Sequence, residues 1–190
     1  MINIEDLKVS LMLHPRFNHS IGVMKMALKL NAMHHLGIDE DKIKIASLLH
    51  DIAKNIDVNE QIELLLSCVP EVVTKELYDS LPVIHAFCGK VIAKYQYNIE
   101  DEEILDAIFY HTTGRSAMSN LEKLIFLSDY TEEGRIGENF EQVRSVSYKS
   151  IDEAIVKMLE QNFEYIKSKN MHIHSLSLDA YNYYKGVTKC

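Results

Sequence analysis

The sequence contains little glycine, proline or cysteine: 7, 3 and 3 residues of 190. With 47% apolar and 25% charged residues, this composition excludes collagen-like, low-complexity and disordered chains, and it leaves few signals for the turns that join β-strands. The cysteines are odd in number and form no Cys-x-x-Cys pair, which argues against a disulfide framework or a thiolate zinc site. We therefore expect Cys68, Cys88 and Cys190 to be reduced thiols in a globular protein.

Long uncharged segments are also missing. The longest stretch without Asp, Glu, Lys or Arg is the ten residues from Ser80 to Gly89, whereas a membrane-spanning helix needs about 20 predominantly apolar residues. The first residues, Met1 to Asp6, contain neither a basic segment nor an apolar run of the kind that directs secretion. We expect a cytoplasmic protein that has no membrane partner.

Positive charge is in deficit, because 20 Lys and Arg stand against 28 Asp and Glu and give a net charge of −8. An acidic surface repels the phosphate backbone of DNA and RNA, so we expect no nucleic-acid polymer as a partner. A small phosphorylated ligand stays open, since a few Lys or Arg and bound metal ions can make one local site cationic.

Apolar residues recur with a period near 3.6 along almost the whole chain, which together with its length predicts an all-α fold in a single domain over residues 1–190. We expect Asp39, Asn98 and Ser119 to cap helices and Gly37 to end the second one. The predicted helices cover residues 4–13, 15–36, 40–55, 58–67, 70–79, 82–97, 101–112, 119–131, 140–149, 151–169 and 175–185.

Ionisable side chains interrupt the apolar faces of five of these helices. His19 shares a helix face with Val23 and Met26, and His50 with Asp51 interrupts the apolar stripe of the third helix. The same helical spacing turns three further residues inward: His85, His111 and Asp129.

Burying two carboxylates costs several kcal/mol unless cations or hydrogen bonds compensate. A single histidine on an apolar face is more often a hydrogen-bonded core residue than a metal ligand. Four histidines and two aspartates together, without a thiolate, form a set suited to iron, manganese, cobalt or zinc. Because six ligands exceed the needs of one ion with open positions, we expect two ions that share a carboxylate.

Three sequence runs carry a family resemblance: Arg16 to Val23, Leu48 to Lys54, and His111 to Arg115 leading on to Ser128 to Glu132. The chain resembles the dinuclear HD-domain superfamily of metal-dependent phosphohydrolases through one ordered set: His19, His50-Asp51, His85, His111 and Asp129. Within that superfamily it is most similar to the YqeK-type symmetrical diadenosine tetraphosphate hydrolases, over residues 7–184. An isolated His-Asp dipeptide would be a weak signal, but the ordered set is highly specific.

The resemblance implies a helical bundle with a dinuclear metal centre in its core. It assigns His19, His50, Asp51 and Asp129 to one ion, and Asp51, His85 and His111 to the other, with Asp51 as the bridge. Iron is the implied metal, with manganese, cobalt or zinc as alternatives. A hydroxide that bridges the ions would attack the substrate, diadenosine tetraphosphate, and release two ADP. A homodimer is also open.

The phosphates of such a substrate need positive charge and hydrogen-bond donors. Lys54 follows His50 and Asp51 at helical spacing, and we expect it to act with Asp51 in catalysis rather than to be a solvated helix end. Cys88, one turn after His85, is interpreted as a buried small apolar residue rather than a ligand. The further substrate contacts that the sequence suggests are Arg16, Thr112, Gly114, Arg115 and Arg135.

Two other functions remain open at this point. One is an HD-domain nucleotidase or triphosphohydrolase that acts on mononucleotides. The other is a protein without catalysis that senses a nucleotide or a metal. Loss of a ligand would mark such a sensor, and all six ligand positions are filled. The sequence therefore favours the enzyme.

Overall fold

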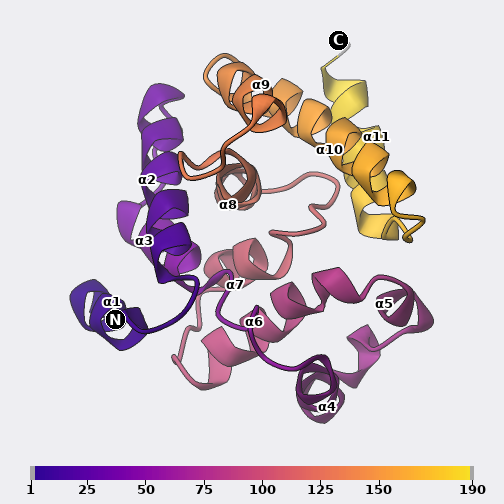
Figure 1. Ribbon diagram of the computed structural model, residues 1–190. Coiled ribbons are helices and arrows are strands. Elements are labelled where there is room, and N and C mark those ends of the chain that lie inside the picture. The colour runs from indigo at the N-terminus through magenta and orange to yellow at the C-terminus, as the bar shows by residue number, and fades with distance from the viewer. Residues whose placement is uncertain (1–2, 189–190) are drawn as a thin grey trace.

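The computed structural model describes residues 3–188, and these residues fold into helices (Figure 1). The α-helices are α1 (Ile4–Leu11), α2 (Phe17–Met33), α3 (Glu40–Leu49), α4 (Val58–Cys68), α5 (Lys75–Asp79), α6 (Ile84–Tyr95), α7 (Glu102–Phe109), α8 (Asn120–Thr131), α9 (Glu138–Ser147), α10 (Ile151–Ser168) and α11 (Ser175–Val187). No strand occurs between residues 3 and 188, so the all-α prediction is confirmed. Within the same range, no helix has both the length and the apolar character that crossing a membrane requires. Cys190 lies outside the described residues.

Short polar side chains begin helices at two of the predicted positions. Asp39 accepts a hydrogen bond from the first turn of α3, and Ser119 forms a reciprocal capping box with Glu122 at the start of α8. The prediction for Asn98 is wrong. Asp101 caps α7 instead, while Asn98 adopts a left-handed conformation (φ 52°) in the turn that precedes it.

The ends of α2 and α3 differ from the predicted ones. α2 ends at Met33, and the first left-handed residue after it is His35 (φ 51°) rather than Gly37. α3 ends at Leu49 instead of continuing to residue 55. Beyond it, the N–H of Lys54 donates to the carbonyl of Asp51, three residues back, in one of several short turns. The His-Asp pair therefore lies at the end of a helix and not within one.

The predicted helix 70–79 is divided into two pieces. A short 3₁₀ turn, η1, covers Pro70–Val72, and α5 begins separately after Thr74, whose side chain accepts a hydrogen bond from the N–H of Leu77. A second 3₁₀ turn, η2 (Leu81–Val83), joins α5 to α6. These breaks form a bent connection between α4 and α6.

Helices α2, α3, α7 and α8 form the centre of the molecule. α2 packs against α3 and α8, and α7 packs against α3, α6 and α8. Figure 1 shows α8 near the middle, with α2 and α3 to its left, α4 to α6 below it, and α9 to α11 above and to its right. One apolar cluster joins the central helices to α10, a second joins α4, α5 and α6, and Ile52 packs against both. The segment that follows α3 therefore lies where the two clusters meet.

Glu76 on α5 binds the start of α11, 99 residues further along the chain. Its carboxylate accepts hydrogen bonds from the backbone N–H of Ser175 at 2.7 Å and from the Ser175 hydroxyl at 2.9 Å. It thereby satisfies a free N–H at a helix N-terminus. Burial alone would raise the pKa of Glu76, but the hydrogen bonds from Ser175 and the neighbouring His174 and His172 lower it below its usual value.

Replacing Glu76 by Gln is expected to lower the free energy of unfolding at pH 7 by about 1–2 kcal/mol, because hydrogen bonds to a charged acceptor contribute more than those to a neutral one. Since the folded-state pKa of Glu76 is lowered, this contribution is present above the pKa of the unfolded state and is lost as the pH falls through the folded one. Denaturant unfolding of wild type and Glu76→Gln at pH 7 and near pH 3.5 should show the difference shrinking in acid. Glu63→Gln, an exposed change on α4, is the matched control, and an equal difference at both pH values would contradict the prediction.

Candidate metal centre

Six ionisable side chains from five segments converge where the central helices meet. They are His19 on α2, His50 and Asp51 directly after α3, His85 on α6, His111 two residues after α7, and Asp129 on α8. The structure thus brings together all the residues that the sequence predicts to point inward. Five of the six are at most 10% exposed in their side chains, and Asp129 is 23% exposed.

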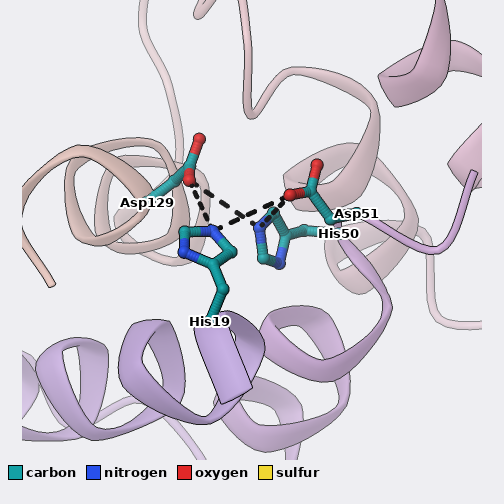
Figure 2. A group of neighbouring side chains, drawn as sticks. All are labelled: His19, His50, Asp51 and Asp129. Atoms are coloured by element: carbon teal, nitrogen blue, oxygen red, sulfur yellow. Dashed lines mark hydrogen bonds and ion pairs between the residues drawn. The ribbon is translucent and has the colours of Figure 1, made fainter. Parts of the chain in front are cut away.

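The first group consists of His19, His50, Asp51 and Asp129, whose ligand atoms all lie within 4.8 Å of one another. His19 Nε2 is 2.9 Å from Asp129 Oδ1 and 3.7 Å from Asp51 Oδ2. His50 Nε2 is 3.5 Å from Asp51 Oδ2 and 3.9 Å from Asp129 Oδ1. Figure 2 shows that these imidazoles and carboxylates face a common centre.

The second group consists of Asp51, His85 and His111, again with ligand atoms within 4.8 Å of one another. His85 Nε2 is 3.2 Å from Asp51 Oδ1, and His111 Nε2 is 3.6 Å from the same oxygen. Asp51 therefore faces the first group with one carboxylate oxygen and the second group with the other. A carboxylate in this position can be shared by two neighbouring cations.

Each of three histidines is oriented by a carbonyl of its own chain segment. The Nδ1 atoms of His50, His85 and His111 lie 2.7, 2.9 and 2.7 Å from backbone carbonyl oxygens three residues earlier. A carbonyl oxygen only accepts, so Nδ1 must carry the proton and donate it. This tautomer leaves each Nε2 with its lone pair directed into the cluster, which is the form in which imidazole binds a metal.

The inward nitrogens fit a cation better than they fit one another. The buried Nε2 of His50 has no hydrogen-bond partner within residues 3–188. The Nε2 atoms of His85 and His111 lie 3.2 Å apart, although the carbonyls at their Nδ1 atoms leave neither Nε2 with a proton to donate. The lone pairs of His50 and His111 thus face no donor, which is costly when they are buried, and metal ions would satisfy both.

The electrostatics of the cluster favour positive charge at its centre. Burial would raise the pKa of Asp51, but the imidazoles of His50, His111 and His85 around the carboxylate hold it far below its usual range. The pKa of Asp129 is likewise low despite burial, because of the His19 hydrogen bond and the nearby His50 imidazole. Burial lowers the pKa of His85 to about 4. The carboxylates are thus ionised and His85 is neutral near pH 7, as metal ligands must be.

Two arginines pair with the two carboxylates of the cluster. Arg16 Nε donates to Asp51 Oδ2 at 2.8 Å, and its Nη2 lies 2.8 Å from the same oxygen. Arg135 Nη2 donates to Asp129 Oδ1 at 3.0 Å, and Arg135 Nε donates to the Asp129 carbonyl at 3.2 Å. The phosphate contacts expected of both arginines stay predictions, because each guanidinium is bonded here to an aspartate.

A cavity of about 1090 Å³ opens beside the cluster. Lys54, His85, Thr112, Asp129 and Arg135 line the part nearest the two groups, and its far walls come from α5, α9, α10 and α11. Lys54 Nζ lies 3.2 Å from His85 Nε2. Thr112 also lines the cavity, and its buried hydroxyl has no hydrogen-bond partner within residues 3–188.

The substrate contacts expected of Arg115 and Gly114 also stay predictions, and both residues have bonding partners within the protein. Arg115 donates to Glu122 at 2.6 and 3.0 Å and stacks over the Tyr110 ring. The N–H of Gly114 is bonded to the Tyr110 carbonyl at 2.8 Å, so it is not free to meet a phosphate. Gly114 has φ 63°, and a Cβ there would lie 3.2 Å from Phe126, so a turn and close packing account for this glycine.

Sequence reasoning missed Glu132, which lies behind His19. It is 6% exposed, and its Oε1 is 3.3 Å from His19 Nδ1. Glu132 and Glu133 are adjacent acids after a predicted helix, and nothing in their order indicates that the first is buried and the second exposed. Only the path of the chain after α8 distinguishes them.

Comparison with known proteins identifies the class. The model of the HD domain family matches residues 16–134, which contain all six residues of the cluster. The chain belongs to the HD domain family.

Individual relatives within this family are similar over most of the chain, and they confirm the resemblance to symmetrical diadenosine tetraphosphate hydrolases. A symmetrical bis(5'-nucleosyl)-tetraphosphatase of Halalkalibacterium halodurans is 37% identical over 167 residues, which cover 88% of this chain and 87% of the relative. One of Staphylococcus aureus is 32% identical over 171 residues, covering 89% and 86%. A crystal structure from Clostridium acetobutylicum, described as a predicted HD superfamily hydrolase involved in NAD metabolism, is 30% identical over the full length of both chains, with a TM-score of 0.91.

Purified protein is expected to bind two metal ions per chain, because its ligands form two groups joined by Asp51. Complete chelation should lower the melting temperature, since the ions bind the folded state and not the unfolded one. At a metal concentration 100 times the dissociation constant of each of the two sites, the difference is roughly 10–20 °C for a chain of this size. Metal analysis and thermal scans check this expectation. One ion per chain after reconstitution, or an unchanged melting temperature, would refute it.

Proposed function

We propose that this protein hydrolyses diadenosine tetraphosphate symmetrically to two ADP, using two metal ions held by the six clustered side chains. The observation that carries the proposal is the position of Asp51, which faces both ligand groups with different oxygens. The curated relatives named symmetrical bis(5'-nucleosyl)-tetraphosphatases support the substrate. Iron is the metal we propose, with manganese, cobalt or zinc as alternatives that the same nitrogen and oxygen ligands accept.

Bound metal ions would supply positive charge that activates water and polarises the phosphoryl group. The protein's own task is then to hold the polyphosphate in place and to neutralise its charge. The position of Lys54 at the cavity, 3.2 Å from His85 Nε2, supports such a role for its ammonium, and the unpartnered Thr112 hydroxyl supports a second contact to a phosphate oxygen. No serine or cysteine nucleophile is needed.

The size of the cavity favours a dinucleotide over a mononucleotide. At about 1090 Å³ it exceeds the usual range for pockets that bind small ligands, roughly 300–1,000 Å³. Its walls away from the cluster carry aromatic side chains, among them Tyr130, Phe140 and Tyr165, which offer surfaces for nucleoside groups. The alternative, an HD-domain nucleotidase for mononucleotides, would leave much of this space unfilled.

Location and assembly stay predictions from the sequence. We propose a cytoplasmic protein that uses a dinucleoside polyphosphate and no nucleic-acid polymer, in keeping with its net charge of −8. A homodimer is part of the same proposal and is decided by the mass of the protein in solution.

Incubation with diadenosine tetraphosphate is expected to give ADP as the sole nucleotide product. In water enriched in oxygen-18, one label should appear on the β-phosphate of half the ADP, because water attacks one of the two central phosphorus atoms. Chromatography and mass spectrometry of the products check both points. Release of AMP and ATP would contradict symmetrical cleavage, and faster turnover of mononucleotides would favour the alternative function.

Asp51→Asn is expected to reduce hydrolysis by more than about 10³-fold and Lys54→Ala by on the order of 10²-fold, because Asp51 faces both metal groups whereas Lys54 neutralises one phosphate. Steady-state rates and metal content are to be measured for both variants. Lys94→Ala, on the exposed end of α6, is the control and should match wild type. An Asp51 variant that keeps two ions and normal turnover would show that the bridge is assigned wrongly.

A further inference from the structure

Glu132 is a buried acid whose two carboxylate oxygens accept different hydrogen bonds. Its Oε1 lies 3.3 Å from His19 Nδ1, and its Oε2 accepts the backbone N–H of Gly134 at 2.6 Å. It is the residue directly after α8, the helix that carries Asp129. Glu132 therefore connects the chain segment that follows Asp129, one proposed ligand, to the imidazole of His19, another proposed ligand.

His19 differs from the other three histidines of the cluster in what orients it. Those three donate Nδ1–H to backbone carbonyls in their own segments, whereas His19 Nδ1 faces a carboxylate 113 residues away in sequence. A carboxylate is a stronger acceptor than a carbonyl, and it makes the imidazole a more basic ligand.

The approach of Glu132 to α2 depends on a glycine. Gly22 lies one turn after His19, and a Cβ at this position would lie 2.5 Å from Glu132 Oε2. Glycine has a lower helix propensity than alanine, so Gly22 destabilises α2 slightly. Its lack of a side chain leaves space for the Glu132 carboxylate.

Arg144 on α9 fixes the backbone that carries Glu132. Its guanidinium donates to the carbonyls of Thr131, Glu132 and Arg135 at 2.6, 2.8 and 2.8 Å. The backbone on both sides of the carboxylate is therefore held from outside the cluster, and the side chain has little freedom to turn away from His19.

We propose that Glu132 is a positioning residue of the metal centre: when an ion replaces the proton shared by His19 Nε2 and Asp129 Oδ1, which lie 2.9 Å apart, Glu132 accepts the remaining Nδ1 proton of His19 and so keeps the Nε2 lone pair directed at that ion. This inference rests on the proposed metal centre. Glutamine cannot replace Glu132, because its amide has one acceptor oxygen for two donors. If the amide oxygen accepts the Gly134 N–H, the amide NH₂ faces His19 Nδ1. It then favours the His19 tautomer in which Nε2 is protonated, and a protonated Nε2 cannot bind a metal.

The test is Mn²⁺ binding by the full-length, chelated protein, followed by electron paramagnetic resonance of the free ion. Glu132→Gln is expected to weaken one of two Mn²⁺ sites by about 10–100-fold, the usual effect of removing a partner that orients a ligand. The other site should bind as in wild type. Glu133→Gln, which makes the same change at the adjacent exposed residue, should bind like wild type at both sites.

Melting temperatures of the chelated variants separate positioning from a structural role. Equal values for wild type and Glu132→Gln, with one weakened site, support the proposal. Wild-type affinity at both sites in Glu132→Gln overturns it, as does an equal loss at both sites with a lower melting temperature.

If Glu132→Gln does not fold, Gly22→Ala is the second test, because this change keeps the Glu132 carboxylate but displaces it. One weakened site in Gly22→Ala supports the proposal, and two unchanged sites overturn it. A wild type that binds no Mn²⁺, iron, cobalt or zinc would instead overturn the proposed function, and this inference with it.

Discussion

The structure depends on bringing two ionised carboxylates and four imidazole lone pairs to one place among apolar helices. Buried carboxylates repel each other, and buried imidazole lone pairs lack hydrogen-bond donors. Each buried charge or acceptor without a partner destabilises the folded state. Asp51 experiences this most strongly: it is 3% exposed and faces His50, His85 and His111 at 3.2–3.6 Å. The helices around the cluster are arranged so that cations can compensate this cost.

Two arginines of the protein also balance the negative charge of the two carboxylates. Arg16 and Arg135 each contact one carboxylate, on Asp51 and Asp129, at 2.8 and 3.0 Å. Both guanidiniums remain partly exposed, at 29% and 34%. The phosphate contacts expected of them from the sequence stay predictions.

The sequence predicts most of the fold because the helices have clear apolar faces and strong starting signals, such as Ser119. It also predicts the six residues of the cluster, since buried ionisable groups stand out on those faces, and it correctly treats Cys88 as core: the thiol donates to the Gln61 carbonyl and burial raises its pKa to about 12. It does not predict features set by distant contacts. The burial of Glu132 depends on His19, a neighbour far away in the chain. The end of α3 at Leu49 and the N–H of Gly114 bonded to Tyr110 are local turns that the apolar period does not mark, and the one-domain organisation stays a prediction.

Three of the four histidines carry their own orienting acceptor within the same short stretch of chain: Ser47 for His50, Pro82 for His85 and Ile108 for His111. Each such segment is a self-contained unit, in which the backbone turn alone sets the direction of the ring. The orienting bond of each of these rings therefore spans only three residues and needs no partner from another segment of the chain. His19 is the exception, since its ring acquires its partner when the chain after α8 reaches α2. The orientation of three of the imidazole rings is thus set by the local backbone, whereas that of His19 is set by a contact between distant parts of the chain.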